Sequence, residues 1–508
     1  MNDLPPGWAW ARLDEIAEVR LGRQRSPKNH SGDNMRPYLR AANVDWNGLK
    51  LDDVKQMNFT DDEARVYRLQ PGDIVLGEAS GSPSEVGKPA LWNGEIEDCC
   101  FQNTLLRVRS YGPEPRYLLH FLRAEALRGG FVAHSRGVGI RHLGASRLAS
   151  WPVPIPPLAE QRRIVVAIED HLSLLEWAAS TIVSARSKLD GFMRVVYSFA
   201  VRGGVADLCP TYPAFIDQLA KRRHAIWLDS NPSKSYKPPM PPDISLAPLI
   251  PEGWAITSLE AITDPLRTIR YGILMPRVTN GGTVPYIEVK DLAGGTLQGK
   301  QLHRTSSKLD EQFSGARLAA GDVVMAIRGS YERSAVVPPE MDGANISRDV
   351  ARISPLPGVS PDYIHTYLQS AFAQSYFGRH ARGVAVKGIN LSALRRLPIV
   401  LPTLEVQRRI TQEVGAQIST AENLNETLKT ARFRANTLRR SLLREAFMGR
   451  LLPHDPKDEP ASELLAWIRA ERAGSPVRRT RGGRTPNKLA PPVTTVTTDD
   501  FRQGELPL

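Results

Sequence analysis

The segments whose residue types and spacing come nearest to a catalytic motif are few, and the first of them is 81–88. Its sequence, Gly-Ser-Pro-Ser-Glu-Val-Gly-Lys, is similar to a phosphate-binding loop. That loop has four residues between its glycines and a Ser or Thr after the lysine that binds magnesium. Here five residues separate the glycines, and Pro89 follows the lysine. The spacing therefore argues against nucleotide binding.

A second candidate is the pair Glu288 and Lys290, which alternate in a predicted strand. An acidic residue and a lysine in this arrangement are found in metal-dependent nucleases. Magnesium is held mainly by oxygen ligands, and no second carboxylate is evident beside Glu288. In the internal repeat described below, the corresponding residues are Arg40 and Ala42. A nuclease site is an alternative that these observations oppose.

Signatures of other cofactors are missing as well. The ten histidines have no paired zinc spacing, and two of the three cysteines are the adjacent pair Cys99 and Cys100. We find no glycine fingerprint for a dinucleotide or a methyl donor, and no Asn-Pro-Pro-aromatic tetrapeptide. The sequence predicts a chain without catalytic residues, cofactor or metal of its own.

The composition indicates where the chain works and what it binds. The 508 residues include 66 Lys and Arg against 54 Asp and Glu, a net charge of +12 that favours a polyanionic partner such as nucleic acid. Charge alone leaves open a merely basic soluble protein. No apolar run approaches the roughly 20 residues of a membrane span, and the N-terminus has no signal peptide pattern. We expect a cytoplasmic protein with no membrane partner.

The elements that must position any functional residue occur twice. Residues 151–164 read Trp-Pro-Val-Pro-Ile-Pro-Pro-Leu-Ala-Glu-Gln-Arg-Arg-Ile, and residues 397–410 repeat this pattern 246 positions later. Because proline fixes φ and cannot donate inside a helix, each copy predicts a switch from extended chain to helix. Further landmarks repeat at nearly the same offset. They are 4–8 and 250–254, 37–39 and 285–287, 69–76 and 318–325, 117–121 and 363–367, and 136–138 and 382–384.

This repeat predicts an α+β protein. We expect two similar domains of mixed α/β structure, joined by a pair of long antiparallel coiled-coil helices, with an internal pseudo-two-fold repeat. In each half a Gly-Asp turn, at Gly72 and Gly321, leads into a short β-branched run that reads as a buried strand. Two independent helices, each packed on its own domain, are the alternative.

Heptad spacing follows both switches, with the same register in the two copies. We expect a seam about 50 to 60 Å long that places one domain at each end of a spacer. The predicted seam residues are Ile168, Leu175, Ile182, Leu189 and Val196 with Ile164, His171, Ala178, Ala185, Phe192 and Phe199 in the first helix, and Val414, Ala421, Leu428, Ala435 and Leu442 with Ile410, Gln417, Leu424, Ala431 and Leu438 in the second.

The structure of the remaining segments is predicted from their composition. Residues 200–249 are rich in Pro, Lys and Ser, which predicts an extended linker, and a capped helix is expected to begin near Ala461. The basic tail is expected to be disordered. The predicted division is 1–159 first domain, 160–199 central helix, 200–249 linker, 250–404 second domain, 405–449 distal helix, 450–474 short helix region and 475–508 tail.

Taken together, these motifs resemble the specificity subunit of type I restriction-modification systems. The resemblance rests on the Pro-Gly-Trp and Pro-Glu-Gly-Trp starts, the two Gly-Asp strands, the two Gln-Arg-Arg-Ile switches, and the segments 446–451 (Ala-Phe-Met-Gly-Arg-Leu) and 458–461 (Asp-Glu-Pro-Ala). It covers residues 4 to about 472. The doubled arrangement makes it specific.

The resemblance implies a function and a set of partners. Two target recognition domains would each read one half of a bipartite asymmetric site in double-stranded DNA, and the helix pair would set the gap. Two modification (methyltransferase) subunits and two restriction (ATP-dependent translocase and nuclease) subunits would complete the complex. S-adenosylmethionine, ATP and magnesium would then belong to the partner subunits.

Candidate DNA-binding residues lie in the polar, Gly-rich loops, because these loops differ between the halves while the frame does not. Lys and Arg there would neutralise phosphates, and side chains at base edges would supply specificity. The candidates are Ser80, Ser82, Lys88, Arg136, Arg141 and His142 in the first domain, and Arg328, Ser330, Tyr331, Arg333, Arg382, Lys387 and Asn390 in the second.

Two other functions remain open. One is an autonomous restriction or methylation enzyme with a DNA-reading region, which the missing cofactor motifs oppose. The other is a scaffold whose coiled coil joins partner proteins without binding DNA. The arginines of the two switches, at 162, 163, 408 and 409, could bind a modification subunit, the DNA backbone, or only neighbouring carboxylates.

Overall fold

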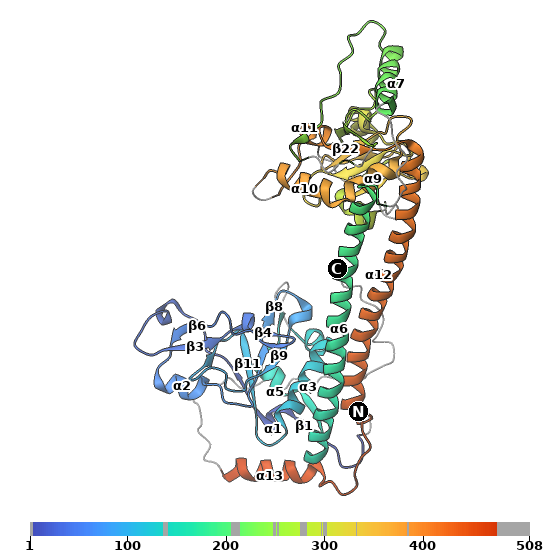
Figure 1. The fold of residues 1–508 in the computed structure, drawn as a ribbon. Coiled ribbons are helices and arrows are strands. Elements are labelled where there is room, and N and C mark those ends of the chain that lie inside the picture. Colours follow the sequence, from blue (N-terminus) through green and yellow to red (C-terminus); the bar gives the residue numbers. More distant parts are fainter. Residues whose placement is uncertain are drawn as a thin grey trace. The chain divides into compact units, whose positions relative to one another are not determined.

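The chain folds into two compact units, each containing one α/β domain and parts of two long helices (Figure 1). A computed structural model describes residues 4–135, 141–204, 214–246, 250, 253–274, 282–295, 297, 302–331, 333–383 and 386–474. The first unit comprises Met1–Thr181 with Ala431–Leu508, and the second comprises Ile182–Thr430.

The first domain contains two main sheets, with strand orders β2-β11-β7-β9 and β10-β3-β6, and three two-stranded pairs, β1-β13, β12-β8 and β4-β5. Its elements are β1 (Ala9–Arg12), α1 (Leu13–Ile16), β2 (Ala17–Leu21), β3 (Met35–Leu39), β4 (Val44–Asp45), β5 (Gly48–Leu49), β6 (Lys55–Asn58), α2 (Asp61–Tyr67), β7 (Ile74–Gly77), β8 (Ala79–Ser80), β9 (Pro89–Leu91), β10 (Cys100–Phe101), β11 (Leu105–Ser110), α3 (Pro115–Leu127), α4 (Gly130–Ala133), β12 (Arg141–His142), α5 (Ala145–Ala149) and β13 (Pro152–Ile155).

The second domain repeats the two main sheets in the same order, as β15-β21-β18-β19 and β20-β16-β17, and adds the pair β14-β22. This confirms the predicted α+β fold and its internal repeat. The elements are β14 (Ala255–Ser258), β15 (Arg270–Tyr271), β16 (Val284–Ile287), β17 (His303–Thr305), α8 (Ser307–Gln312), β18 (Val323–Ala326), β19 (Ser334–Val336), β20 (Asn345–Ile346), β21 (Val350–Ile353), α9 (Pro361–Gln369), α10 (Ala371–His380), α11 (Leu391–Arg395) and β22 (Pro398–Leu401).

The Gly-Asp turns precede fully buried strands, β7 and β18, as predicted. The buried carboxylate of Asp73 accepts from Gln70 N at 2.7 Å and pairs with Arg109 at 2.7 Å. Asp322 does the same with Ala319 N at 2.7 Å and Arg267 at 2.8 Å. A buried carboxylate needs such partners, which explains why the turn recurs with its aspartate.

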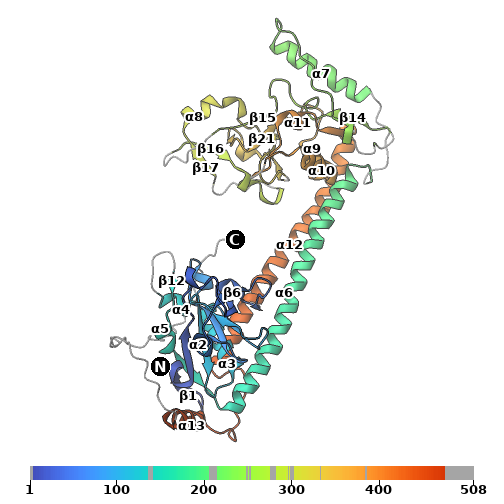
Figure 2. The same ribbon diagram turned by 90° about the vertical axis from the view of Figure 1, so that its left-hand side faces the viewer.

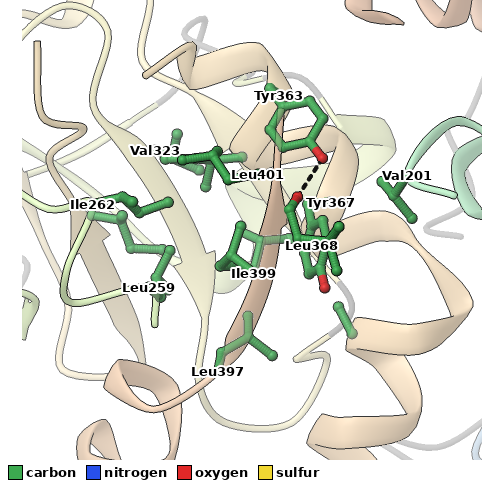
Figure 3. Packing of buried hydrophobic residues seen from close by; sticks show 14 of the residues in the cluster. Val201, Leu259, Ile262, Val323, Tyr363, Tyr367, Leu368, Leu397, Ile399 and Leu401 are labelled. Atoms are coloured by element: carbon green, nitrogen blue, oxygen red, sulfur yellow. Dashed lines mark hydrogen bonds between the residues drawn. The ribbon is translucent and has the colours of Figure 1, made fainter. Parts of the chain in front are cut away.

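The proline segments form the last strand of each domain and pair with its first strand. In the first domain Ala9 faces Ile155, and in the second Ala255 faces Leu401, both in antiparallel ladders. Figure 3 shows Ile399 and Leu401 of β22 among the buried side chains of the second core, where Tyr363 Oη of α9 donates to Val400 O at 2.6 Å. Each domain is thus closed where its chain enters a long helix.

The glutamine of each switch fixes the start of that helix. The Gln161 side chain accepts from Glu114 N at 2.8 Å and donates to Pro156 O at 2.9 Å. Gln407 makes the corresponding bonds with Ser360 N and Pro402 O, both at 2.8 Å. Because all four backbone groups belong to the adjoining domain or proline segment, the repeated Gln joins domain and helix.

The two predicted long helices are α6 (Leu158–Ala200) and α12 (Leu404–Phe447). They lie side by side in Figures 1 and 2. In the first unit the N-terminal half of α6 packs against the C-terminal end of α12, with Glu176 and Arg439 paired at 2.8 Å. In the second unit Val196 shares a core with Ile410, near the other ends of the helices. The pairing is antiparallel, as predicted.

The second predicted seam set is correct at its first residues, Ile164 and Ile410, which are buried, but it is displaced by one residue further along each helix. Ile168, Leu189 and Val196 are buried as expected, but His171, Phe192 and Phe199 are exposed. Leu172 and Ala200, one residue further along, are buried instead. In α12, likewise, Leu424 and Leu438 are exposed, whereas Ile418 and Ala446 are buried. Both helices therefore contact each other at spacings of four and then three from Ile168 and Val414.

The prediction of an extended linker over 200–249 is wrong for Ala214–Ser230, which form helix α7. The helix packs on its own domain, where the Leu219 side chain lies against Gly358. A Cβ atom added to Gly358 would be only 3.2 Å from Leu219 Cδ2. Helix α13 (Ala461–Gly474), which begins where predicted, packs in the same way against the first domain. There the Ile468 side chain lies against Gly112, and a Cβ atom added to this glycine would be only 3.1 Å from Ile468 Cδ1. The predicted disordered tail, 475–508, lies outside the described residues.

Candidate nucleic-acid interface

Two short segments, residues 78–82 directly after strand β7 and residues 141–143, lie side by side. We call them the first loop pair. Strand β8 pairs with β12, so Ser80 faces Arg141 and Ala79 faces His142. Leu143 N donates to Glu78 O at 2.9 Å, and His142 Nδ1 lies 3.0 Å from Glu78 Oε2. Four predicted residues, Ser80, Ser82, Arg141 and His142, are therefore neighbours.

The other two candidates of the first domain do not join this group. Lys88 is only 13% exposed and pairs with Glu85 and Asp45. Its ammonium is thus occupied within the fold. Arg136 lies outside the described residues.

The second domain has a corresponding second loop pair, residues 327–331 and, among the described residues, 382, 383 and 386–389. Ile389 N donates to Ile327 O at 2.8 Å, and Gly329 N donates to Lys387 O at 3.0 Å. Gly388 forms bridges with both Arg328 and Arg382. The segment with Arg328 and Ser330 and the segment with Arg382 and Lys387, more than 50 positions apart in sequence, come together here.

Three predicted residues of the second domain have structural contacts. Asn390 caps α11, with its Oδ1 accepting from Ala393 N at 2.7 Å. Tyr331 packs against the core of the second unit. Arg333 donates to Val289 O at 3.4 Å. The Oδ1 atom of Asn390 is therefore engaged in capping α11, and only the other exposed atoms of this side chain could contact a ligand.

Next to Arg328 lies an open hollow of about 410 Å3, lined by Glu288, Val289, Lys290, Ser347, Arg348 and Asp349. Arg328 Nε lies 3.8 Å from Asp349 Oδ1, which links the hollow to the second loop pair. Glu288 Oε2 lies 2.8 Å from Lys290 Nζ and 2.9 Å from His303 Nδ1. Burial raises the pKa of the adjacent Asp291, although its carboxylate accepts from Glu288 N.

Sequence reasoning considered Glu288 and Lys290 only as a nuclease pair and omitted Ser347, Arg348 and Asp349. The available signal was the change from Arg40 to Glu288 at a position shared by both halves. The nitrogen atoms of Lys290 and His303 contact the Glu288 carboxylate, where a magnesium site would need oxygen ligands. Across the described residues, no group of three His, Cys, Asp or Glu side chains could hold a metal ion.

The switch arginines fall into two classes. Arg163 pairs with Asp458 at 2.6 Å in the segment before α13, and this contact ties the C-terminal segment to α6. Arg162, Arg408 and Arg409 are exposed in the first turns of their helices.

In the described part of the chain, no helix is both long and apolar enough to span a membrane.

Two copies of one domain, each with a polar loop pair and each joined to a long helix, define a protein built from a repeated α/β module. Residues 5–180 match the family model of the type I restriction modification DNA specificity domain. The fold is also that of a chain in a solved structure concerning complex assembly and conformational transition of the type I R-M system. That chain is 19% identical, with a TM-score of 0.62, over 89% of this chain and 100% of that one.

Curated relatives extend the match over both halves. The Type I restriction enzyme EcoBI specificity subunit of Escherichia coli is 26% identical over 420 residues, which cover 80% of this chain and 81% of the relative. The EcoKI specificity subunit of Escherichia coli (strain K12) is 22% identical over 504 residues, covering 93% and 97%. Residues 5–180 thus carry the type I restriction modification DNA specificity domain, and both halves of the chain are similar to type I restriction enzyme specificity subunits.

Proposed function

We propose that this chain reads a bipartite, asymmetric DNA site with its two α/β domains and has no catalytic activity of its own. One observation carries the proposal. The two domains share their strand order and their backbone hydrogen bonds, yet their loop pairs carry different polar side chains. A common frame with divergent polar loops supports two readers with two targets.

The chemistry of the loop pairs suits this role. Arg141, Arg328 and Lys387 can neutralise phosphates, which would supply affinity that weakens with salt. Serine and arginine side chains can also reach base edges in the major groove. The net charge of +12 favours the same partner. We assign the two readers to residues 1–159 and 250–404, and the spacer to 160–199 and 405–449.

Recruitment of the other subunits would use the helices. Helix α6 exposes large apolar side chains, which include Val166, Leu174 and Trp177 in the first unit and Phe192, Val195 and Phe199 in the second. Trp177 is 70% exposed and Val195 is 65% exposed. Exposed apolar patches of this kind mark protein interfaces. They support binding of two modification subunits, with two restriction subunits completing the complex.

The partners would then supply the chemistry. S-adenosylmethionine belongs with the modification subunits, and ATP and magnesium belong with the restriction subunits. This division also explains how a chain can determine a methylation pattern without a cofactor fingerprint in its sequence. The chain positions the complex on DNA, and its partners act there.

The proposal is tested by mapping methylated bases in a host that carries the complete system. We expect methylation at two fixed half-sites separated by a constant gap. The purified complex should also lose affinity for its site by about 10³- to 10⁵-fold between 50 and 200 mM salt, if it contacts six to ten phosphates. A single continuous target, or activity of the isolated chain with methyl donor or magnesium, would contradict the proposal.

The recruitment surface is tested by changing Phe192 and Val195 together to Glu. Burying each side chain against a partner should stabilise binding by about 1.5 to 3 kcal/mol, so the double variant should bind a modification subunit 10²- to 10⁴-fold more weakly. Titration of purified subunits measures this change. Arg194→Glu, on an exposed position of the same turn, is the matched control and should bind nearly as the parent does.

A further inference from the structure

The two domains share a second set of equivalent positions, at the ends of the strands in the three-stranded sheet. Tyr38 faces Lys55 and Cys100 in the ladders of β3, and Tyr286 faces His303 and Asn345 in those of β16. The buried Tyr38 and Tyr286 are therefore equivalent. Two residues after each tyrosine lie Arg40 and Glu288.

Backbone hydrogen bonds extend this equivalence to the segment after the parallel partner strand. Gln102 N donates to Leu39 O, and Ser347 N donates to Ile287 O, both at 2.9 Å. Glu78 N donates to Thr104 O at 2.9 Å, and Ile327 N donates to Asp349 O at 2.8 Å. The corresponding positions are Arg40 and Glu288, Ala42 and Lys290, Lys55 and His303, Gln102 and Ser347, Asn103 and Arg348, and Thr104 and Asp349.

These positions adjoin the loop pairs in both domains, through the same bonds. The residue that donates to Thr104 O is Glu78 of the first loop pair, and the residue that donates to Asp349 O is Ile327 of the second. Every one of the six positions nevertheless differs in residue type between the domains. The backbone is kept while the hydrogen-bonding side chains, and even the sign of the charge, change.

In the second domain the side chains at these positions include carboxylates that can accept hydrogen bonds in the hollow. Lys290 Nζ and His303 Nδ1 both contact Glu288 Oε2, so Oε1, which is hydrogen-bonded to none of the described residues, is available to accept a hydrogen bond. Asp349 Oδ1 lies 3.6 Å from Arg348 Nε and 3.8 Å from Arg328 Nε, and it has no hydrogen-bond partner among the described residues. The hollow is therefore lined by two carboxylates, those of Glu288 and Asp349, beside the guanidinium groups of Arg348 and Arg328, and Glu288 offers the acceptor.

In the first domain the same positions present donors. Arg40 pairs with Asp53 at 2.6 Å, and a hydrogen bond from Lys55 holds the pKa of Asp53 below its usual range. Arg40 Nε is buried and has no hydrogen-bond partner in the described part of the chain. The amide of Asn103 is half-buried at the position of Arg348. This set suits acceptor-rich purine edges, whereas the set around Glu288 suits an exocyclic amino group.

We propose that these six positions in each domain, together with the loop pairs, read base edges and determine specificity. Glu288 accepts from the amino group of a cytosine or adenine, while Arg348 contacts the neighbouring base. In the first domain Arg40 and Asn103 contact a guanine and an adenine, respectively. The inference rests on the proposed function and assigns which residues perform it.

The test compares methylomes of complete systems carrying Glu288→Gln, Arg348→Ala or Asn103→Ala. We expect Glu288→Gln and Arg348→Ala each to relax one position of one half-site by about 5- to 150-fold and to leave the other half-site unchanged. Asn103→Ala should relax the other half-site. Arg304→Ala, which removes an exposed cation from the same sheet, is the control and should leave the motif unchanged.

Each other outcome is decisive. An unchanged motif from an active complex, or equal weakening on all sequences, would overturn the inference, since the residues would then be solvated or bound to phosphates. If a variant gives no methylation, its thermal unfolding is measured first, and competition with oligonucleotides permuted in each half-site then decides for the folded complex. A parent system that methylates no bipartite site would instead reject the proposed function.

Discussion

Replacing residues 1–159 with the corresponding domain of a relative that has a different mapped target should change one half of the recognised sequence and leave the other half intact. Each mismatched base pair costs about 1 to 3 kcal/mol in a specific complex. Three changed pairs should therefore weaken binding to the parent site by about 3 to 9 kcal/mol, which removes its methylation. The hybrid site should be methylated instead.

The structure specifies how the exchange must be made. The junction has to keep Gln161, whose side chain bonds Glu114 N of the domain and Pro156 O of the proline segment. The donor domain should also have a small residue at the position of Gly112, where Ile468 of α13 packs. Exchange of residues 250–404 is the reciprocal control. Methylation mapping that shows both halves altered would contradict the assignment of one reader to each domain.

Lengthening both long helices by one heptad should increase the gap between the half-sites without changing their bases. Repeating residues 175–181 in α6 and 424–430 in α12 adds about 10.5 Å, at 1.5 Å per residue. DNA rises about 3.4 Å per base pair, so the preferred gap should grow by about three base pairs.

The geometry also predicts that the longer chain binds its new site less tightly than the parent binds its own. Seven residues change the helix phase by only about 20°, whereas three base pairs rotate the second half-site by roughly 100°. The DNA or the helix pair must absorb this difference in twist. Binding to a set of oligonucleotides with graded gaps measures both the shift and the loss.

An insertion in α6 alone is the matched control. It adds length to one helix only, so buried residues of α6 such as Ile168 and Leu189 cannot all keep their neighbours, and it should lower the unfolding temperature. An unchanged gap in a folded variant with both insertions would reject the spacer role of the helix pair.

Local signals in the sequence account for most of the fold. Proline fixes backbone angles, a Gly-Asp turn stops one strand and starts another, and heptad spacing gives a helix one apolar face. All three act over a few residues and therefore survive in a single sequence. Their recurrence at 246 positions predicted two equivalent domains and two antiparallel helices, and the strand orders of the two domains confirm the repeat.

The errors arise where packing chooses between local possibilities. Apolar residues occupy helical positions on both sides of the true seam, so the pattern alone could not separate Leu172 from His171 or Ala200 from Phe199. Helix α7 was missed because its helical segment lies within a stretch dominated by Pro, Lys and Ser. It is stabilised on its own domain by contacts such as that of Leu219 near Gly358, which the linker composition does not reveal.

The sequence by itself determined the duplication, the class of fold and the loops in which DNA-reading residues should be sought. Only the tertiary structure decided which of those residues meet. Arg328 forms a bridge with Gly388 and an ion pair with Asp349, while Lys88 and Asn390 are occupied by an ion pair and a helix cap. The physical reason is that side-chain neighbourhoods depend on pairings between distant strands, which no local pattern encodes.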